Sequence, residues 1–268
     1  MTFRYYSDRF ILTPGPTEIP WRVYRALIKR ATNPDLDPEF LNLYNEVRRK
    51  IARLVNASGS SIYVMSGEAM LGLEAAIANT IGRGDKVIVV ANGVYGEAFS
   101  ELVEAYGGKP VLVTGTYKRR IETDLVKTAL EENPDAVAVT LVHCDTPSAI
   151  LNPLKDIGNI VSKTDAILIV DAVSSMGGVE IDVDGWGVDI LIGGTQKALN
   201  MTPGLTIMTV SKKAWRRIEE RDYNGFYMSL TVWREELDEE GFFPYTMPEA
   251  LFYALNEALN IIFEEGIQ

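Results

Sequence analysis

Two residues of opposite charge each follow a short apolar stretch of the chain. Asp171 comes directly after the run that ends at Val170, and Lys197 lies on a glycine-lined turn just past residues 190–194. A carboxylate at the end of a buried strand needs a cation or a donor, because desolvation otherwise costs several kcal/mol. Partial burial makes a lysine more nucleophilic by lowering its pKa. Singly, each residue also fits a structural role: an N-cap or ion pair for Asp171, and a side chain reaching water for Lys197.

The segment Ser66-Gly67-Glu68-Ala69 joins a predicted strand to a predicted helix. Such a turn points the free N–H groups and the positive end of the helix dipole at an anion. A phosphate group fits such a place. On its own, the Ser-Gly pair is more often part of an ordinary strand-to-helix turn.

These three features together match the needs of one cofactor. A buried lysine, a buried acid and an anion-binding helix start on one rim of a parallel sheet are what pyridoxal 5′-phosphate requires. Lys197 would form an imine, Asp171 would keep the pyridine nitrogen protonated, and the helix start would bind the phosphate. In open parallel sheets, ligands bind beyond the carboxyl ends of the strands, where all three features lie.

The elements that position these residues follow a regular order. Short β-branched runs alternate with longer amphipathic stretches, which is typical of βα units wound onto a mostly parallel sheet. We expect strands at residues 61–65, 86–90, 111–114, 136–142, 166–170, 189–192 and 205–210. We expect helices at residues 69–81, 97–106, 123–132, 154–163, 212–221 and 248–264. The predicted fold class is α/β, with a mostly parallel sheet flanked by helices.

The N-terminal forty residues differ because prolines should prevent any long element there. The prolines are Pro14, Pro16, Pro20, Pro34 and Pro38. We expect residues 1–40 to form an arm, residues 41–246 to form the cofactor-binding large domain, and residues 247–268 to begin an interdomain helix. The arm either is purely structural or carries a loop into the site.

Composition argues against several classes of function. The 268 residues include 37 acidic and 26 basic side chains, and the net charge of −11 has the wrong sign for binding nucleic acid. A single cysteine and no zinc-site spacing predict no metal and a cytoplasmic location. Residues 1–10 are too charged for a signal peptide, and no apolar run is long enough to span a membrane. The shortage of Gln and Cys is a bias of thermophile proteins.

Several motifs occur in order along nearly the whole chain. They are Thr13-Pro-Gly-Pro-Thr17, Ser66-Gly67 with Leu73-Glu-Ala-Ala76, Ala91-Asn-Gly-Val-Tyr-Gly96, His143-Cys-Asp-Thr-Pro-Ser148, Val170-Asp-Ala-Val-Ser-Ser175 and Gly194-Thr-Gln-Lys-Ala-Leu199. This set resembles the class V aminotransferases of fold type I, above all the alanine–glyoxylate and serine–glyoxylate (serine–pyruvate) branch. The interval from Asp171 to Lys197 is also similar to the spacing in that family.

The resemblance implies a role for each residue around the cofactor ring. Lys197 corresponds to the Schiff-base lysine that also moves the proton, and Asp171 to the partner of the pyridinium nitrogen. Val173 packs on one face of the ring, and Tyr95 corresponds to the aromatic residue stacked on the other. Thr146 matches the hydroxyl residue that bonds the phenolic oxygen.

The resemblance also implies contacts away from the ring. The residues that match phosphate contacts are Gln196, Glu68, Ala69 and Met70. Thr246 is similar to a residue that reaches a phosphate in the neighbouring subunit, which implies a homodimer with shared active sites. Gly15, in the arm, matches a backbone position that lines the substrate pocket.

The sequence departs from the family pattern mainly at the phosphate end. Glu68 and Ala69 stand where small Ser, Thr or Gly residues are common, and a carboxylate repels a phosphate unless its side chain turns away. Phe243 stands where a phosphate-binding tyrosine is usual. The family continues into a C-terminal small domain whose arginine binds the substrate carboxylate. That domain is missing here, so the chain is expected to be a fragment or a natural short form.

The function implied by the resemblance is transfer of an amino group from a small amino acid, alanine or serine, to a 2-oxo acid such as glyoxylate or pyruvate. One alternative is a catalytically deficient cofactor-binding subunit of a larger assembly, motivated by the missing arginine. Another is a lyase that uses the same cofactor, because the same carbanion can lose a β-substituent. His143, the only histidine, is expected at the rim of the site rather than as a general base.

Overall fold

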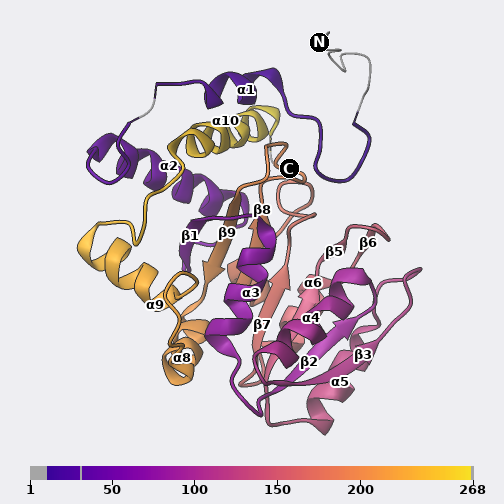
Figure 1. Ribbon diagram of the computed structural model, residues 1–268. Helices are drawn as coiled ribbons and strands as arrows, with labels where there is room; N and C mark the ends of the chain where they lie inside the picture. The colour runs from indigo at the N-terminus through magenta and orange to yellow at the C-terminus, as the bar shows by residue number, and fades with distance from the viewer. Residues whose placement is uncertain (1–10, 31, 267–268) are drawn as a thin grey trace, which may run out of the picture.

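A computed structural model describes residues 11–30 and 32–266 (Figure 1). The first ten residues of the expected arm, on which the signal-peptide argument rests, lie outside the described residues. So do Ala31 and the last two residues of the expected C-terminal helix.

A seven-stranded sheet lies at the centre of the described part of the chain, in the order β1-β9-β8-β7-β4-β2-β3. Neighbouring strands are parallel except where β9 pairs antiparallel with β1 and β8. The strands are β1 (Ser61–Ser66), β2 (Lys86–Ala91), β3 (Lys109–Thr114), β4 (Ala136–Val142), β7 (Ile167–Asp171), β8 (Ile190–Gly194) and β9 (Leu205–Val210). The prediction of a mostly parallel sheet is confirmed.

The central strands are buried on both faces and are mainly apolar. Strands β7, β8 and β9 are buried along their whole length. Continuous Val, Ile and Leu runs are typical of parallel strands because helices cover both faces of such sheets. A short hairpin of β5 (Cys144–Asp145) and β6 (Ile150–Leu151) follows β4 at its carboxyl end.

Helices pack against the sheet and connect its strands (Figure 1). They are α1 (Trp21–Leu27), α2 (Pro38–Leu54), α3 (Ala69–Thr80), α4 (Val94–Ala105), α5 (Thr123–Glu132), α6 (Leu154–Val161), α7 (Val183–Trp186), α8 (Lys212–Arg221), α9 (Leu230–Trp233), a π-helical segment (Arg234–Glu240) and α10 (Glu249–Glu265). Predicted and observed bounds coincide for α5, β4, β9 and α8. For the other predicted elements the ends differ by one to three residues, and no element was predicted at α1, α2, α7, α9, the π-helical segment, β5 or β6.

Pro38 begins a long helix instead of interrupting one. Proline is tolerated at the first position of a helix because its missing N–H would have no partner there. The buried face of α2 includes Phe40, Tyr44 and Val47. The expectation that prolines prevent any long element in the first forty residues is therefore wrong at this point. The boundary expected at residue 40 falls inside α2.

The preceding part of the arm lies along α10, with α1 and α10 side by side (Figure 1). Arg22 bonds to Glu257 at 2.7 Å and to the two carboxylate oxygens of Glu264 at 2.5 and 2.9 Å. Exposed ion pairs of this kind contribute at most about 1 kcal/mol. The burial of Val23 and Ala26 therefore contributes more to holding α1 in place.

Candidate active site

The carboxyl ends of the parallel strands meet around a cavity of about 260 Å³. Its walls are Gly15, Pro16, Glu68, Ala69, Met70, Leu73, Tyr95, Thr146, Asp171, Val173, Gln196, Lys197 and Pro203. Every predicted site residue except Thr246 belongs to this set. They come together because each follows a parallel strand at the same edge of the sheet or, for Gly15, lies on the arm that covers that edge.

Lys197 lies on the turn that follows β8 and is 8% exposed. The turn approaches α3 so closely that a Cβ atom on Gly194 would lie 2.8 Å from the Cβ of Ala69. Glycine is therefore needed at position 194 to bring the lysine to the cavity. Burial lowers the pKa of the Lys197 amine, and the carboxylate of Asp171 opposes this effect. A lowered pKa leaves more of the amine in its nucleophilic neutral form.

Asp171 is the last residue of β7 and is 5% exposed. Burial raises its pKa to about 6, and the charge of Asp145 acts in the same direction. The backbone N–H of Val173, which donates to Oδ1 at 2.8 Å, and the ammonium of Lys197 both favour the carboxylate. The acid is thus held in a fixed orientation and ionises near neutral pH.

The side walls of the cavity come from residues that follow β2, β5 and β7. Tyr95 is the second residue of α4, the helix that follows β2. Thr146 follows the short strand β5, and its hydroxyl lies 2.5 Å from the hydroxyl of Ser174. Val173 is buried in the turn after β7. The cavity thus has an aromatic ring, an aliphatic side chain and a hydroxyl around its acid and its amine.

The start of α3 is already capped by a carboxylate. Glu68 is the N-cap residue, and its Oε1 accepts a 3.1 Å hydrogen bond from the backbone N–H of Met70. Its Oε2 lies 3.5 Å from Nε2 of Gln196. Among the described residues, none forms a hydrogen bond to the buried Oε1 of Gln196. The Glu68 side chain therefore points at the start of α3. This end of the cavity presents two hydrogen-bond acceptors, the carboxylate of Glu68 and the amide oxygen of Gln196.

The N-terminal arm reaches the lysine turn. The hydroxyl of Thr17 donates to the backbone carbonyl of Lys197 at 3.0 Å. A Cβ atom on Gly15 would lie 2.1 Å from Cδ of Lys197 and 2.9 Å from the carbonyl oxygen of Gln196. The arm therefore fits over the lysine only because residue 15 has no side chain.

Two residues singled out from the family pattern lie away from the cavity. The hydroxyl of Thr246 bonds to Asp35 at 3.0 Å and does not line the cavity. The ring of Phe243 packs against Phe40 and Tyr44 at centroid distances of 5.3 and 5.0 Å. Within this chain, neither residue contributes to the cavity.

His143 is buried, not at the rim. It is 4% exposed, and Nδ1 lies 3.0 Å from the hydroxyl of Ser175. Burial lowers its pKa to about 4, so the ring is neutral at physiological pH. Sequence reasoning also gave no role to Asp145 and Ser174, which contact Tyr95 and Thr146 respectively. Their only signal was membership of the two motifs that contain Thr146 and Asp171.

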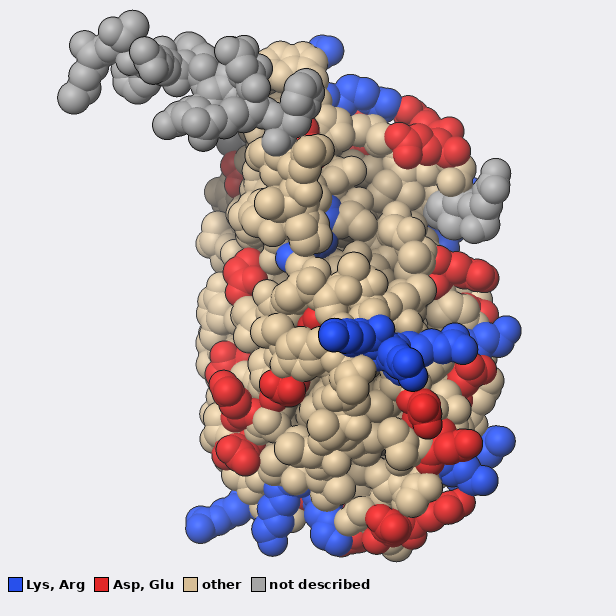
Figure 2. All heavy atoms as spheres, turned by 90° about the vertical axis from the view of Figure 1, so that its right-hand side faces the viewer, with Lys and Arg blue, Asp and Glu red and all other residues tan. Residues whose placement is uncertain are grey.

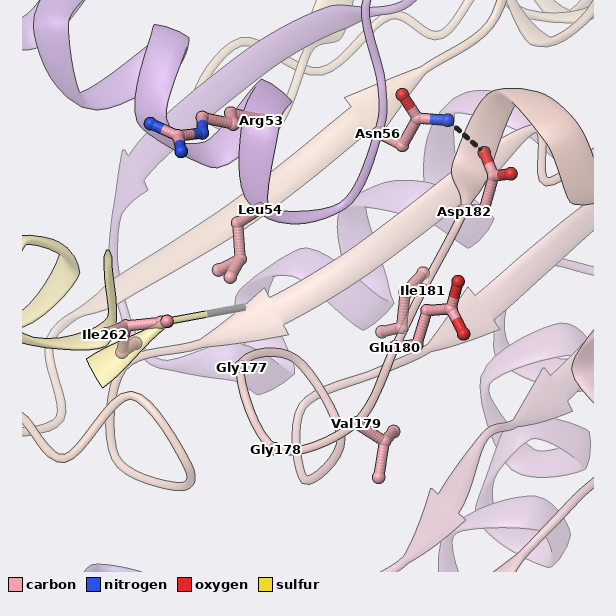
Figure 3. A pocket seen from close by; sticks show the side chains of 11 residues that line it. Arg53, Leu54, Asn56, Gly177, Gly178, Val179, Glu180, Ile181, Asp182 and Ile262 are labelled. Carbon is pink, nitrogen blue, oxygen red and sulfur yellow. Dashed lines mark hydrogen bonds between the residues drawn. The ribbon is translucent and has the colours of Figure 1, made fainter. Parts of the chain in front are cut away.

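A second cavity, of about 380 Å³, lies between the end of α2 and the segment 177–182 (Figure 3). Its polar groups include Arg53, Glu180 and the pair formed by Asn56 and Asp182, whose side chains are 2.5 Å apart. None of the predicted site residues lines it. Size alone therefore does not identify the functional site, because the smaller cavity holds the lysine and the acid.

Neither a metal site nor a membrane span is found among the described residues. Over the described residues, His, Cys, Asp and Glu side chains form no group of three that could hold a metal ion. Within the same ranges, no helix has the length and apolarity needed to cross a bilayer. Figure 2 shows acidic and basic side chains interspersed over the described surface of the face that carries β3, β5 and β6.

The fold and the cavity together define a class of enzyme. Residues 12–268 match the family described as aminotransferase class-V, and the chain belongs to that family. It is 36% identical over 261 residues to an uncharacterized aminotransferase of Methanocaldococcus jannaschii, a match covering 97% of this chain and 67% of that protein. It is 34% identical over 269 residues to the pyridoxamine–pyruvate transaminase of Mesorhizobium japonicum, covering 99% and 68%.

A solved structure agrees with these matches. The alanine–glyoxylate aminotransferase of Nostoc sp. superposes with a TM-score of 0.93 at 28% identity, over 99% of this chain and 71% of that one. The likeness confirms the prediction of a fold type I aminotransferase. This chain thus spans about two thirds of the length of these relatives.

Family membership implies pyridoxal 5′-phosphate as the cofactor. The residues at the ring end of the cavity fit it: an amine, a buried acid, a hydroxyl and two side chains that can enclose a ring. The phosphate end fits less well. Glu68 occupies the helix start with a carboxylate, and the free oxygen of Gln196 needs a donor, whereas a phosphate dianion offers only acceptors.

Proposed function

We propose that this chain binds a vitamin B6 ring and transfers an amino group between a small amino acid, alanine or serine, and a 2-oxo acid such as pyruvate or glyoxylate. The observation that carries the proposal is that Lys197 and Asp171, which follow or end neighbouring strands, line one cavity. There the ammonium of Lys197 lowers the pKa of Asp171, and the carboxylate of Asp171 raises the pKa of Lys197. When bound, pyridoxal 5′-phosphate supplies a ring that accepts the electrons left on the substrate Cα.

In this proposal each residue acts on a stated group. Nζ of Lys197 would hold the ring and, as a free amine, would take the proton from the substrate Cα. The carboxylate of Asp171 would hold a proton on the ring nitrogen, which would make the ring a better electron acceptor. Tyr95 and Val173 would enclose the ring, and the hydroxyl of Thr146 would bond to the ring oxygen.

Single-turnover spectra test this proposal against the two alternatives. Adding alanine or serine to the loaded chain should convert the ring to its pyridoxamine form and release the 2-oxo acid. Lys197→Ala, the matched control, should not turn over. Release of ammonia with the ring unchanged would identify a lyase. A ring that binds but stays unchanged with every amino acid would identify a cofactor-binding subunit, and both results would contradict transamination.

A second candidate function is amino-group transfer between pyridoxamine and pyruvate, with an unphosphorylated B6 molecule as substrate. The observation that favours it is the pair of acceptors, Glu68 and Gln196, at the end of the cavity where a phosphate would lie. A neutral hydroxymethyl group donates a hydrogen bond to such acceptors, whereas a phosphate dianion is repelled by the carboxylate. The relative named pyridoxamine–pyruvate transaminase supports this candidate.

The two candidates differ in the ring they bind. Titrations of the wild-type chain with pyridoxal and with pyridoxal 5′-phosphate, followed by the absorbance of the attached ring, measure both affinities. Under the second candidate, wild type prefers pyridoxal, and Glu68→Ser raises the affinity for the phosphate ester by about tenfold or more. A wild-type preference for the phosphate ester that Glu68→Ser leaves unchanged would contradict it. Glu74→Ser, at an acidic residue outside the cavity lining, is the control.

We also propose a cytoplasmic homodimer in which Thr246 reaches the neighbouring cavity. Support comes from exposed aromatic side chains that follow α8: Tyr227 donates to the carbonyl of Ser66 at the end of β1, and Phe226 and Phe242 are 64% and 61% exposed. Large exposed apolar side chains of this kind are typical of protein interfaces. Light scattering should give twice the chain mass, and Phe226→Ser should weaken the dimer. A monomer at all concentrations would contradict this proposal.

A further inference from the structure

A buried carboxylate beside the cavity has no part in the proposed chemistry. Asp145 is 1% exposed. Its Oδ1 accepts from the backbone N–H of Tyr95 at 3.1 Å, and its Oδ2 accepts from the backbone N–H and the hydroxyl of Ser148 at 3.2 and 2.8 Å. A buried carboxylate is costly unless donors satisfy it, so these contacts are the reason that Asp145 is tolerated there.

One of these contacts replaces a missing helix cap. The N-cap residue of α4 is Gly93, which has no side chain to bond the free N–H groups of the first turn. A Cβ atom on Gly93 would lie 2.4 Å from Cγ of Asp145. The close approach of β5 therefore requires glycine at the cap, and the carboxylate of Asp145 takes over the capping role from another part of the chain.

The same contact joins two walls of the cavity. Tyr95, whose N–H is bonded, contributes the aromatic wall, and Thr146, which follows Asp145 directly, contributes the hydroxyl. The charge of Asp145 also raises the pKa of Asp171, which works against ionisation of the acid in the cavity. The charge of Asp145 is therefore unfavourable for Asp171, and the reason for a carboxylate at position 145 lies in its contacts at the start of α4.

We propose that Asp145 is a positioning residue that holds the Tyr95 ring at a fixed place relative to Thr146 in the cavity. The part of this inference that concerns a bound ring rests on the proposed function. The part that concerns the backbone of Tyr95 does not, because the hydrogen bond is present in the chain alone.

Three variants distinguish a role of Asp145 in positioning Tyr95 from a role in the stability of the fold alone. Asp145→Ala removes every contact. Asp145→Asn keeps an oxygen acceptor for the N–H of Tyr95 and therefore acts as a rescue. Ser148→Ala is the matched control, because it removes a donor to Asp145 without touching Tyr95.

Two measurements on the whole 268-residue chain test whether Asp145 positions Tyr95. The first is hydrogen exchange of the Tyr95 amide without any added ring. The second is the circular dichroism per bound ring at saturation with pyridoxal or pyridoxal 5′-phosphate, which reports ring orientation and is unaffected by a change in stability alone.

In Asp145→Ala, we expect the Tyr95 amide hydrogen to exchange about fivefold or more faster than in wild type. We also expect the circular dichroism per bound ring to be smaller than in wild type. Asp145→Asn should restore both signals, and Ser148→Ala should match wild type. Wild-type dichroism and exchange in Asp145→Ala would overturn the proposal, as would a loss of thermal stability with the dichroism per ring unchanged. If wild type bound neither ring, the proposed function would fail, and the amide exchange would still decide whether Asp145 fixes Tyr95.

Discussion

The hydroxyl of Thr17 donates a 3.0 Å hydrogen bond to the backbone carbonyl of Lys197, 180 residues away in the sequence. This bond fixes the N-terminal arm on the turn that carries the amine. The arm is therefore part of the cavity and not only a packing segment, since Gly15 and Pro16 line it.

The contact between the arm and the lysine leads to a first prediction. Gly15→Ala would place a methyl group 2.1 Å from Cδ of Lys197 and 2.9 Å from the backbone oxygen of Gln196. The arm or the lysine must move, so we expect the affinity for covalently attached pyridoxal or its phosphate to fall by about tenfold or more. Absorbance titration measures this loss.

Gly59→Ala is the control for that substitution. Its added methyl group would lie 3.5 Å from the nearest atom, in ordinary contact, and residue 59 does not line the cavity. Equal affinities for Gly15→Ala and Gly59→Ala would show that the arm does not constrain the lysine.

A second prediction concerns the pH dependence of stability. Burial raises the pKa of Asp171 from 3.8 to about 6, so between these values the folded chain holds a proton that the unfolded chain has released. The contribution of Asp171 to the free energy of unfolding is therefore fully present below pH 3.8 and is lost as the pH rises through about 6. The total loss is about 3 kcal/mol. Asp171→Asn removes this loss and keeps an oxygen acceptor for the N–H of Val173.

Urea unfolding of the ring-free chain near pH 4 and near pH 7 measures this effect. We expect Asp171→Asn and wild type to have similar free energies of unfolding near pH 4. Near pH 7 the variant should be more stable by about 3 kcal/mol, although it should bind the ring more weakly. A difference that does not change with pH would contradict the raised pKa.

The only histidine allows a third prediction. Burial lowers the pKa of His143 from 6.5 to about 4, so stability from this group is present above pH 6.5 and is lost as the pH falls through about 4. The C2 proton of a single histidine gives one resolved NMR signal. Its chemical shift should stay constant from pH 8 down to about 5. A midpoint near 6.5 would show that the ring reaches water.

The hydrogen bonds between α2 and β1 lead to a fourth prediction. The buried hydroxyl of Tyr44 accepts from the backbone N–H of Val64 at 2.9 Å and donates to its carbonyl at 3.2 Å. Tyr44→Phe leaves both backbone groups without this partner, which should lower the free energy of unfolding by about 1 to 3 kcal/mol. Tyr24→Phe, at an exposed position of α1, should change it by less than about 0.5 kcal/mol. Equal effects would contradict the structural role of the buried hydroxyl.

The sequence alone was sufficient to predict the sheet, the helix start at residues 66–69 and the pairing of Asp171 with Lys197, whereas the roles of Tyr95 and Thr146 were implied by the resemblance to the family. Apolar runs marked the strands, and the carboxyl ends of parallel strands share an edge, so residues after several strands had to meet. This reasoning placed Asp171 and Lys197 together without any knowledge of loop conformation. It failed at Pro38, because proline at the first position of a helix has the same local signal as proline in a loop.

Contacts between loops were beyond prediction from the sequence. The bonds of Asp145 to Tyr95 and of Thr17 to Lys197 depend on how separate strand ends approach each other. No periodicity or spacing reports that approach. The direction of the Glu68 side chain is a similar case, since a glutamate at this position can either turn away or cap its own helix.

In the proposed function, Lys197 is the residue that attaches the B6 ring. This assignment is tested by incubating the chain with pyridoxal or pyridoxal 5′-phosphate, reducing with borohydride, and mapping the peptides by mass spectrometry. We expect a ring adduct on Lys197 and no stoichiometric adduct in Lys197→Ala. An adduct on another lysine in wild type, or equal labelling of the two proteins, would contradict it.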